Sequence, residues 1–122
     1  MTFEEAQDAL DELIEELPDE IFKGLNCGVA LRDEVLHSSE GLLILGRYHF
    51  EPYGLGRYVT INYGSLMQIY GHLPAPEFRE KIKGVLHHEL THHLEHLAGD
   101  RSLERKDAED VSRILNRRRK KQ

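Results

Sequence analysis

The sequence has little cysteine, little proline and no long hydrophobic run, and each shortage excludes a class of protein. With Cys27 as the only cysteine, the chain can form neither an internal disulfide nor a zinc site built from thiolates. Any bound metal must rely on histidine and carboxylate ligands. No apolar stretch reaches the roughly 18 residues that suggest a membrane span. Four prolines among 122 residues, with 39% hydrophobic residues, indicate one globular domain over residues 1–122.

The lone cysteine also fits a reducing compartment, and we expect Cys27 to be a small buried apolar residue. The N-terminal stretch MTFEEAQDALDELIEEL is acidic and amphipathic, whereas a secretory signal would be basic and then continuously apolar. These features predict a cytoplasmic protein with no membrane segment.

The net charge of -6 is unevenly distributed along the chain. Acidic residues dominate the first twenty positions, whereas the last six residues, RRRKKQ (117–122), form a basic tail. Such a tail can contact nucleic acid. We favour a solvated helix end whose cations offset the helix dipole, because the rest of the chain is acidic and lacks a nucleic-acid motif.

Helical spacing of apolar residues predicts an amphipathic helix over residues 3–17, opened by a capping box from Thr2 and ended by Pro18. A longer pattern predicts a helix over residues 77–98, which Gly99 should end. The remaining helical segments are a possible turn over 21–25, a short helix over 65–72, and a final helix that carries Leu103, Val111, Ile114 and Leu115.

Three short stretches have the composition of strands, over residues 27–33, 41–50 and 56–64. The turn residues of EPYGLG separate the second strand from the third, which predicts a hairpin. One helix, three strands and further helices, in that order, predict an α+β fold with a small antiparallel or mixed sheet.

The segment HELTH, residues 88–92, contains the pattern H-E-x-x-H inside the long predicted helix. Residues four apart lie on one face of a helix, so His88 and His92 can direct two imidazole nitrogens at one ion. Zinc accepts such ligands in tetrahedral geometry. Glu89 can flank the metal without binding it and act as general base. The alternative is a polar helix face that is rich in histidine by chance.

The neighbouring histidines fit this site less well. His87 and His93 point away from the direction of the two ligands, so we expect surface or supporting positions for them. His96 lies on nearly the same face, but it extends the set to a span of about 12 Å along a straight helix. One ion cannot easily contact both ends of that span, and Glu95 has the same difficulty in milder form.

The third ligand should come from beyond the histidine helix. If Gly99 turns the chain back and the final helix packs antiparallel, Asp107 lies on its apolar face at the level of the histidines. A carboxylate on an apolar face needs a partner, which could also be a buried histidine or a backbone amide. We predict Asp107 as the third ligand, ahead of Asp100 and then Glu104.

The segment HELTHHLEHLAG, the strands before it and the acidic N-terminal helix together resemble the small zincin-like metallopeptidase family of bacterial proteins. The resemblance covers nearly the whole chain. It implies a minimal zincin-like α+β domain with a three- to four-stranded sheet, and a zinc-dependent peptidase acting on peptides or proteins. Residue by residue, it supports His88 and His92 as Zn²⁺ ligands and Glu89 as the base.

The sequence departs from the family pattern H-E-x-x-H-x-x-G-x-x-D beyond its second histidine. Glu95 stands at the glycine position and Ala98 at the aspartate position, whereas a glycine and an aspartate follow later as Gly99 and Asp100. The family's third ligand therefore cannot be carried over, and Asp107 is assigned by geometry alone.

These residues predict a hydrolysis in which zinc lowers the pKa of a bound water and Glu89 takes its proton as the water attacks a peptide carbonyl. Zincin-type folds bind extended substrate along an edge strand, for which YVTINY (58–63) is a candidate. Tyr48, Tyr58 or Tyr63 could help to hold the oxyanion, although sheet packing is the role we favour for them.

Other functions also fit the pattern. The domain could be a metal-stabilised binding or regulatory module without turnover, or a metallohydrolase that acts on a substrate other than a peptide. Nucleic-acid binding through the basic tail is a further alternative, which we do not favour. The sequence predicts neither the substrate nor the oligomeric state.

Overall fold

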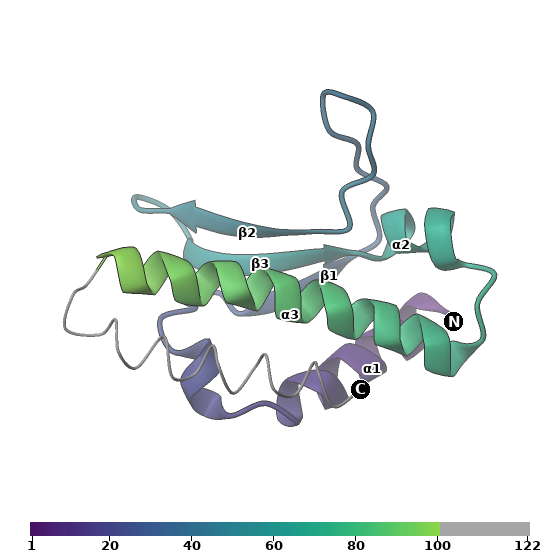
Figure 1. Ribbon diagram of the computed structural model, residues 1–122, viewed down its shortest axis with the longest axis horizontal. Coiled ribbons are helices and arrows are strands. Elements are labelled where there is room, and N and C mark those ends of the chain that lie inside the picture. Colours follow the sequence, from purple (N-terminus) through teal and green to yellow (C-terminus); the bar gives the residue numbers. More distant parts are fainter. Residues whose placement is uncertain (101–122) are drawn as a thin grey trace.

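The computed structural model describes residues 1–100 of the chain and has an α+β fold, as the sequence predicted (Figure 1). The final helix, the basic tail, Glu104 and Asp107 lie outside the described residues. Along the chain the elements are α1 (Phe3–Glu15), a 3₁₀ helix (Asp19–Phe22), β1 (Val29–Arg32), β2 (Gly46–Glu51), β3 (Gly56–Asn62), α2 (Tyr63–Tyr70) and α3 (Ala75–Asp100).

The start of α1 has the predicted capping box. The hydroxyl of Thr2 accepts a hydrogen bond from the backbone N–H of Glu5 at 3.1 Å, and the carboxylate of Glu5 accepts one from the backbone N–H of Thr2 at 2.8 Å. Two N–H groups that the helix itself leaves without acceptors are thereby satisfied. The apolar side of α1 is buried through Ala6, Ala9, Leu10 and Leu13.

The sheet is mixed, with the strand order β1-β3-β2. β3 pairs parallel with β1 and antiparallel with β2, and the β2–β3 pair is the predicted hairpin. β3 therefore lies in the middle, so the prediction of YVTINY as an edge strand is wrong. Its pattern was apolar because a central strand packs against the core, where Val59 and Ile61 are fully buried. β2 is the edge strand that faces α3.

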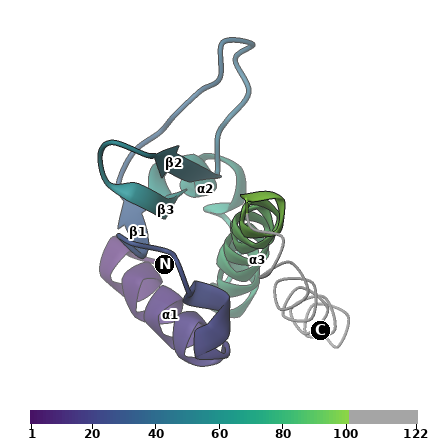
Figure 2. The ribbon, with the colours of Figure 1, turned by 90° about the vertical axis from the view of Figure 1, so that its left-hand side faces the viewer.

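The core lies between the sheet and two helices, α1 and α3, on the same side of it (Figure 2). α3 runs along the sheet for 26 residues and contacts both β2 and β3 (Figure 1). Its buried apolar residues recur every four positions, as expected for one packed face of a helix. They are Phe78, Ile82, Leu86, Leu90 and Leu94.

Several predicted boundaries differ from the structure. α3 continues through Gly99 to Asp100, so the prediction that Gly99 ends the helix is wrong; Gly99 does not adopt the positive φ of a helix-ending glycine. β2 begins at Gly46 rather than at residue 41. The residues before it pair with the other arm of the projecting loop 33–45, where Ile44 N–H donates to the carbonyl of Leu36 at 2.8 Å.

Within residues 1–100, no helix combines the length and the apolar character needed to cross a membrane.

Cys27 is exposed, so its predicted burial is wrong. Its thiol donates to the carbonyl of Leu55 at 3.3 Å, because the residue lies in the turn before β1 and not in the strand.

Gly46 sets the closest approach between β2 and α3. A Cβ atom at this position would lie 2.5 Å from Cγ1 of Val85, 3.2 Å from the carbonyl oxygen of Thr60 and 3.3 Å from Cγ of Glu89. Only glycine permits this spacing, because every other residue would place a β-carbon between strand and helix. The contact positions β2 over the helix segment that carries the H-E-x-x-H pattern.

Replacing Gly46 with alanine should lower the free energy of unfolding by about 1–3 kcal/mol, the usual effect of overpacking a close contact. Gly84→Ala is the matched control, because no heavy atom lies within 4 Å of a Cβ built there. Alanine is about 1 kcal/mol better than glycine inside a helix, so this control should equal or exceed the wild type. Urea denaturation followed by circular dichroism measures both, and a fully stable Gly46→Ala protein would contradict the contact.

Candidate metal centre

His88 and His92 lie one turn apart on α3, and both are exposed. Their Nε2 atoms are 3.1 Å apart and their rings meet edge to face, with centroids separated by 4.6 Å. Two nitrogens that bind one tetrahedral zinc ion, each at about 2.05 Å, are separated by about 3.3 Å. The two imidazoles therefore already lie at nearly the spacing that zinc requires, and they fit this ion.

Glu89 follows the first histidine but is buried, with 7% of its surface exposed. Its carboxylate lies against the β2 edge, where the backbone N–H of Tyr48 donates a hydrogen bond to it. Burial raises the pKa of the Glu89 carboxyl above its ordinary value, and the two histidines and the Tyr48 N–H partly oppose this shift. A carboxyl with a raised pKa beside two potential metal ligands is suited to accept and return a proton.

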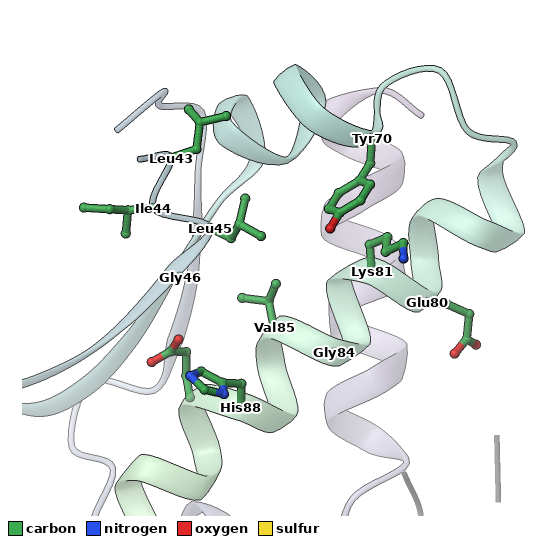
Figure 3. Close-up of a pocket in the computed structure, with 11 residues that line it drawn as sticks. Leu43, Ile44, Leu45, Gly46, Tyr70, Glu80, Lys81, Gly84, Val85 and His88 are labelled. Carbon is green, nitrogen blue, oxygen red and sulfur yellow. The ribbon is translucent and has the colours of Figure 1, made fainter. Parts of the chain in front are cut away.

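Two hollows flank this carboxylate. One is a cleft of about 580 Å³ between β2 and the part of α3 that carries His88, His92 and His96. Its lining residues are Gly46, Arg47, Tyr48, Phe50, His88, Glu89, His92 and His96. The other, of about 510 Å³, extends toward α2 and shares Gly46, His88 and Glu89 with the first (Figure 3). A molecule lying along β2 would therefore pass both the histidines and the carboxylate.

His93 is fully buried, so the surface position considered for it is wrong, and the same holds for His87 at 1% exposure. Nε2 of His93 lies 2.8 Å from the carbonyl of Lys23, and Nδ1 lies 3.0 Å from the Tyr48 hydroxyl. A carbonyl only accepts, so Nε2 carries the hydrogen, and Nδ1 of the neutral ring accepts from Tyr48. His93 thus links α3 to β2 and to the segment before β1.

His96 faces the cleft without joining the two candidate ligands. Its Nδ1 lies 3.1 Å from the Tyr48 hydroxyl and accepts from Nε of Arg57 at 3.2 Å. Its ring packs on Phe50, with centroids 4.5 Å apart. Sequence reasoning gave neither Tyr48 nor Arg57 a definite role here. The sequence signal that β2 lies close to another element is Gly46, because a glycine within a strand pattern often marks such a close approach.

The three tyrosines left open by the sequence have different positions. Tyr48 lines the cleft beside Glu89. Tyr58 stacks on His49 with centroids 4.3 Å apart and donates to Glu51. Tyr63 donates to the carbonyl of Met1 at 2.5 Å. Of these three, Tyr48 is the one positioned to contact a molecule bound at the histidines.

The third metal ligand stays a prediction. Within the part of the chain that the structure describes, no three His, Cys, Asp or Glu side chains gather closely enough to hold an ion. Asp107 and Glu104 lie outside that part, and the side chain of Asp100 is not described either. The structure therefore brings together His88, Glu89 and His92 from the predicted set.

Fold and site define a small α+β domain with a histidine pair and a buried glutamate on one long helix. No protein-family model matches the chain, and no curated protein is found to match it. Among solved structures it is similar to a conserved hypothetical protein from Thermo thermophilus, with a TM-score of 0.70 and 31% sequence identity. The similarity covers 82% of this chain and all of that one. The chain belongs to the family of that protein.

Because His93 is buried, the stability of the folded protein should depend on pH. Burial is the main cause that lowers the pKa of His93 below its ordinary value of 6.5, with Arg57 acting in the same direction and the bond to Lys23 opposing it. As the pH falls below 6.5, the unfolded chain takes up a proton at this residue more readily than the folded chain, whose pKa is lower. The melting temperature of the metal-free protein should therefore decrease as the pH is lowered from about 7 to about 5.

A His93→Gln variant should lose stability at neutral pH, yet show a flatter dependence of melting temperature on pH over this range. His72→Gln provides the control, because His72 is exposed and lies just after α2. If His93→Gln retained the full slope of the wild type, the buried imidazole would not be its source.

Proposed function

We propose that this protein is a zinc-dependent peptidase of the zincin-like metallopeptidase family. The observation that carries the proposal is the convergence of His88 Nε2 and His92 Nε2 to 3.1 Å beside the buried carboxylate of Glu89. Two nitrogens at this spacing suit zinc, and a base that is adjacent but not itself a ligand suits hydrolysis by activated water. Asp107 is proposed as the third ligand.

Zinc bound at this centre would supply a Lewis acid that lowers the pKa of water and polarises a carbonyl group. The residues of the chain do the rest. Glu89 accepts a proton from the attacking water and then donates it to the leaving amine. Burial raises the pKa of the Glu89 carboxyl above its ordinary value, which favours both acceptance and return of the proton. The Tyr48 N–H holds the carboxylate at the β2 edge while it changes charge.

The proposed substrate is an extended segment of a peptide or protein lying along β2. Leu45 directs its carbonyl to β3, where it accepts from Asn62 N–H at 2.8 Å. Because successive residues of a strand alternate, the backbone groups of Gly46 and Phe50 and the carbonyl of Tyr48 face the opposite edge. There an extended substrate can pair by strand addition and pass over His88 and Glu89. Neither a membrane nor a nucleic acid is part of this proposal.

The proposal places the protein in the cytoplasm. A chain with one cysteine needs no oxidising compartment for its stability. At intracellular pH, histidine is available in its neutral form, which is the form that binds zinc.

Glu89→Gln separates hydrolysis from metal binding. The variant should retain zinc, because Glu89 is not a ligand, while peptide cleavage falls by about 10²–10⁴-fold, as is typical for loss of a general base. His88→Ala should lose both zinc and activity. Zinc content by mass spectrometry and cleavage of a broad peptide library by the zinc-loaded protein measure these effects. Zinc binding without any cleavage by the wild type would favour the binding-module alternative instead.

Asp107→Asn tests the third ligand. Zinc affinity should fall by at least about tenfold, because even residues that only support metal ligands typically cause such a loss when replaced. Competition with a fluorescent zinc chelator measures the affinity. Asp8→Asn, an exposed carboxylate on α1, is the control and should bind zinc normally. Unchanged affinity for Asp107→Asn, with a loss for Asp100→Asn or Glu104→Gln, would move the ligand to one of those residues.

A further inference from the structure

The free edge of β2 carries charged side chains on the face of the sheet opposite α1 and α3. These two helices lie on one side of the sheet (Figure 2), and successive residues of β2 alternate between that side and the open one. Tyr48 is the register partner of the fully buried Val59, so it belongs to the helix side. Arg47, His49 and Glu51 therefore lie on the open face.

The charge of Arg47 is not matched by the strand beside it. Arg47 is exposed, and its register partner on β3 is the uncharged Thr60. The Thr60 hydroxyl lies 2.8 Å from Nε2 of His49 and is thereby occupied. Within residues 1–100, no carboxylate lies within ion-pair distance of the Arg47 guanidinium. The guanidinium is consequently available to a strand that adds to the free edge of β2.

The other two side chains of this face differ in charge. The His49 ring stacks on Tyr58, with centroids 4.3 Å apart, so it turns toward β3 and away from the free edge. Burial, followed by nearby Arg47, lowers the pKa of His49 below 6.5, which favours a neutral ring at pH 7. Glu51 is exposed and accepts from the Tyr58 hydroxyl. A carboxylate has further lone pairs that can accept from a cation.

A strand that pairs with β2 places its own side chains opposite these residues. Directly opposite side chains of an antiparallel pair lie about 5 Å apart, where unlike charges attract and like charges destabilise the pair. In antiparallel pairing, the more stable arrangement, the added chain passes Glu51 first and Arg47 four residues later. The cleaved bond lies between these two levels, because the Tyr48 N–H holds the Glu89 carboxylate there.

We infer that the substrate is an extended segment in which a lysine or arginine is followed four residues later by an aspartate or glutamate, and that Arg47 and Glu51 select this charge order. The acidic side chain lies opposite Arg47 after the cleaved bond, and the basic one lies opposite Glu51 before it. The inference rests on the proposed peptidase function. The net charge of -6 by itself favours basic peptides, so a preference for an acid at one position requires a local cation.

Two peptides of identical composition test the charge order. Each is a fluorescein-labelled chain of threonine and valine with one lysine and one glutamate four positions apart, with lysine first in one and glutamate first in the other. The full-length, zinc-loaded Glu89→Gln protein should bind the lysine-first peptide at least about threefold more tightly, as expected from cross-strand charge pairs. Fluorescence anisotropy measures both affinities, and about 1 M sodium chloride should reduce the difference. Equal affinities, or tighter binding of the glutamate-first peptide, would overturn the inference.

Charge reversal identifies the residue that reads the acid. In the same Glu89→Gln background, Arg47→Glu should remove the preference and bind more tightly a peptide with lysine at both charged positions, a gain that only a folded variant can show. Arg32→Glu is the matched control, because Arg32 lies on the same face at the other edge of the sheet, 3.8 Å from Glu34. If Arg32→Glu abolished the preference as fully as Arg47→Glu, overall charge and not the β2 edge would be its source.

Cleavage by the wild type separates this inference from the proposed activity. With a positional peptide library, the zinc-loaded protein should favour an acidic residue after the cleaved bond and a basic residue four positions before that acid. Order-dependent binding by a protein that cleaves no peptide would refute the peptidase and retain the charge selection. Cleavage without a charge preference would retain the peptidase and refute the selection.

Discussion

The contact between Gly46 of β2 and the Val85–Glu89 stretch of α3 is the constraint on which the candidate site depends. With no side chain at this position, the edge strand lies directly against the helix. That spacing brings the Tyr48 N–H to the Glu89 carboxylate and the Tyr48 hydroxyl to His93 and His96. A strand held farther out would leave the glutamate in water, with an ordinary pKa and an unfixed side chain.

The helix divides the three defined positions of H-E-x-x-H between two environments. Successive residues are rotated by about 100° around a helix, so Glu89 turns toward the sheet while His88 and His92 stay together on the open side. The base is consequently buried and the proposed ligands are accessible. His93, on the core side, anchors the same helix through Lys23 and Tyr48. One short stretch of helix thus supplies proposed ligands, a base and an anchor.

Local signals in the sequence were sufficient for much of this. The capping box at Thr2, the hairpin turn before β3 and the helical spacing around HELTH each depend on residues a few positions apart, and each is present in the structure. Strand order depends on contacts between distant segments, so the central position of β3 did not follow from its composition. The burial of His93 likewise depends on Lys23 and Tyr48, which lie 70 and 45 residues away. The continuation of α3 past Gly99 shows that a glycine near a helix end does not by itself end the helix.

The proposed centre requires that His88 and His92 bind zinc through Nε2 while Glu89 remains outside the ligand set. A crystal structure of the zinc-loaded protein, with anomalous scattering measured at the zinc edge, tests it most directly. We expect one peak about 2.0–2.1 Å from both Nε2 atoms and from one carboxylate oxygen of another residue, with the Glu89 carboxylate next to it and unligated. No peak at this position at saturating zinc, or a peak bound instead by Glu89 or His96, would contradict it.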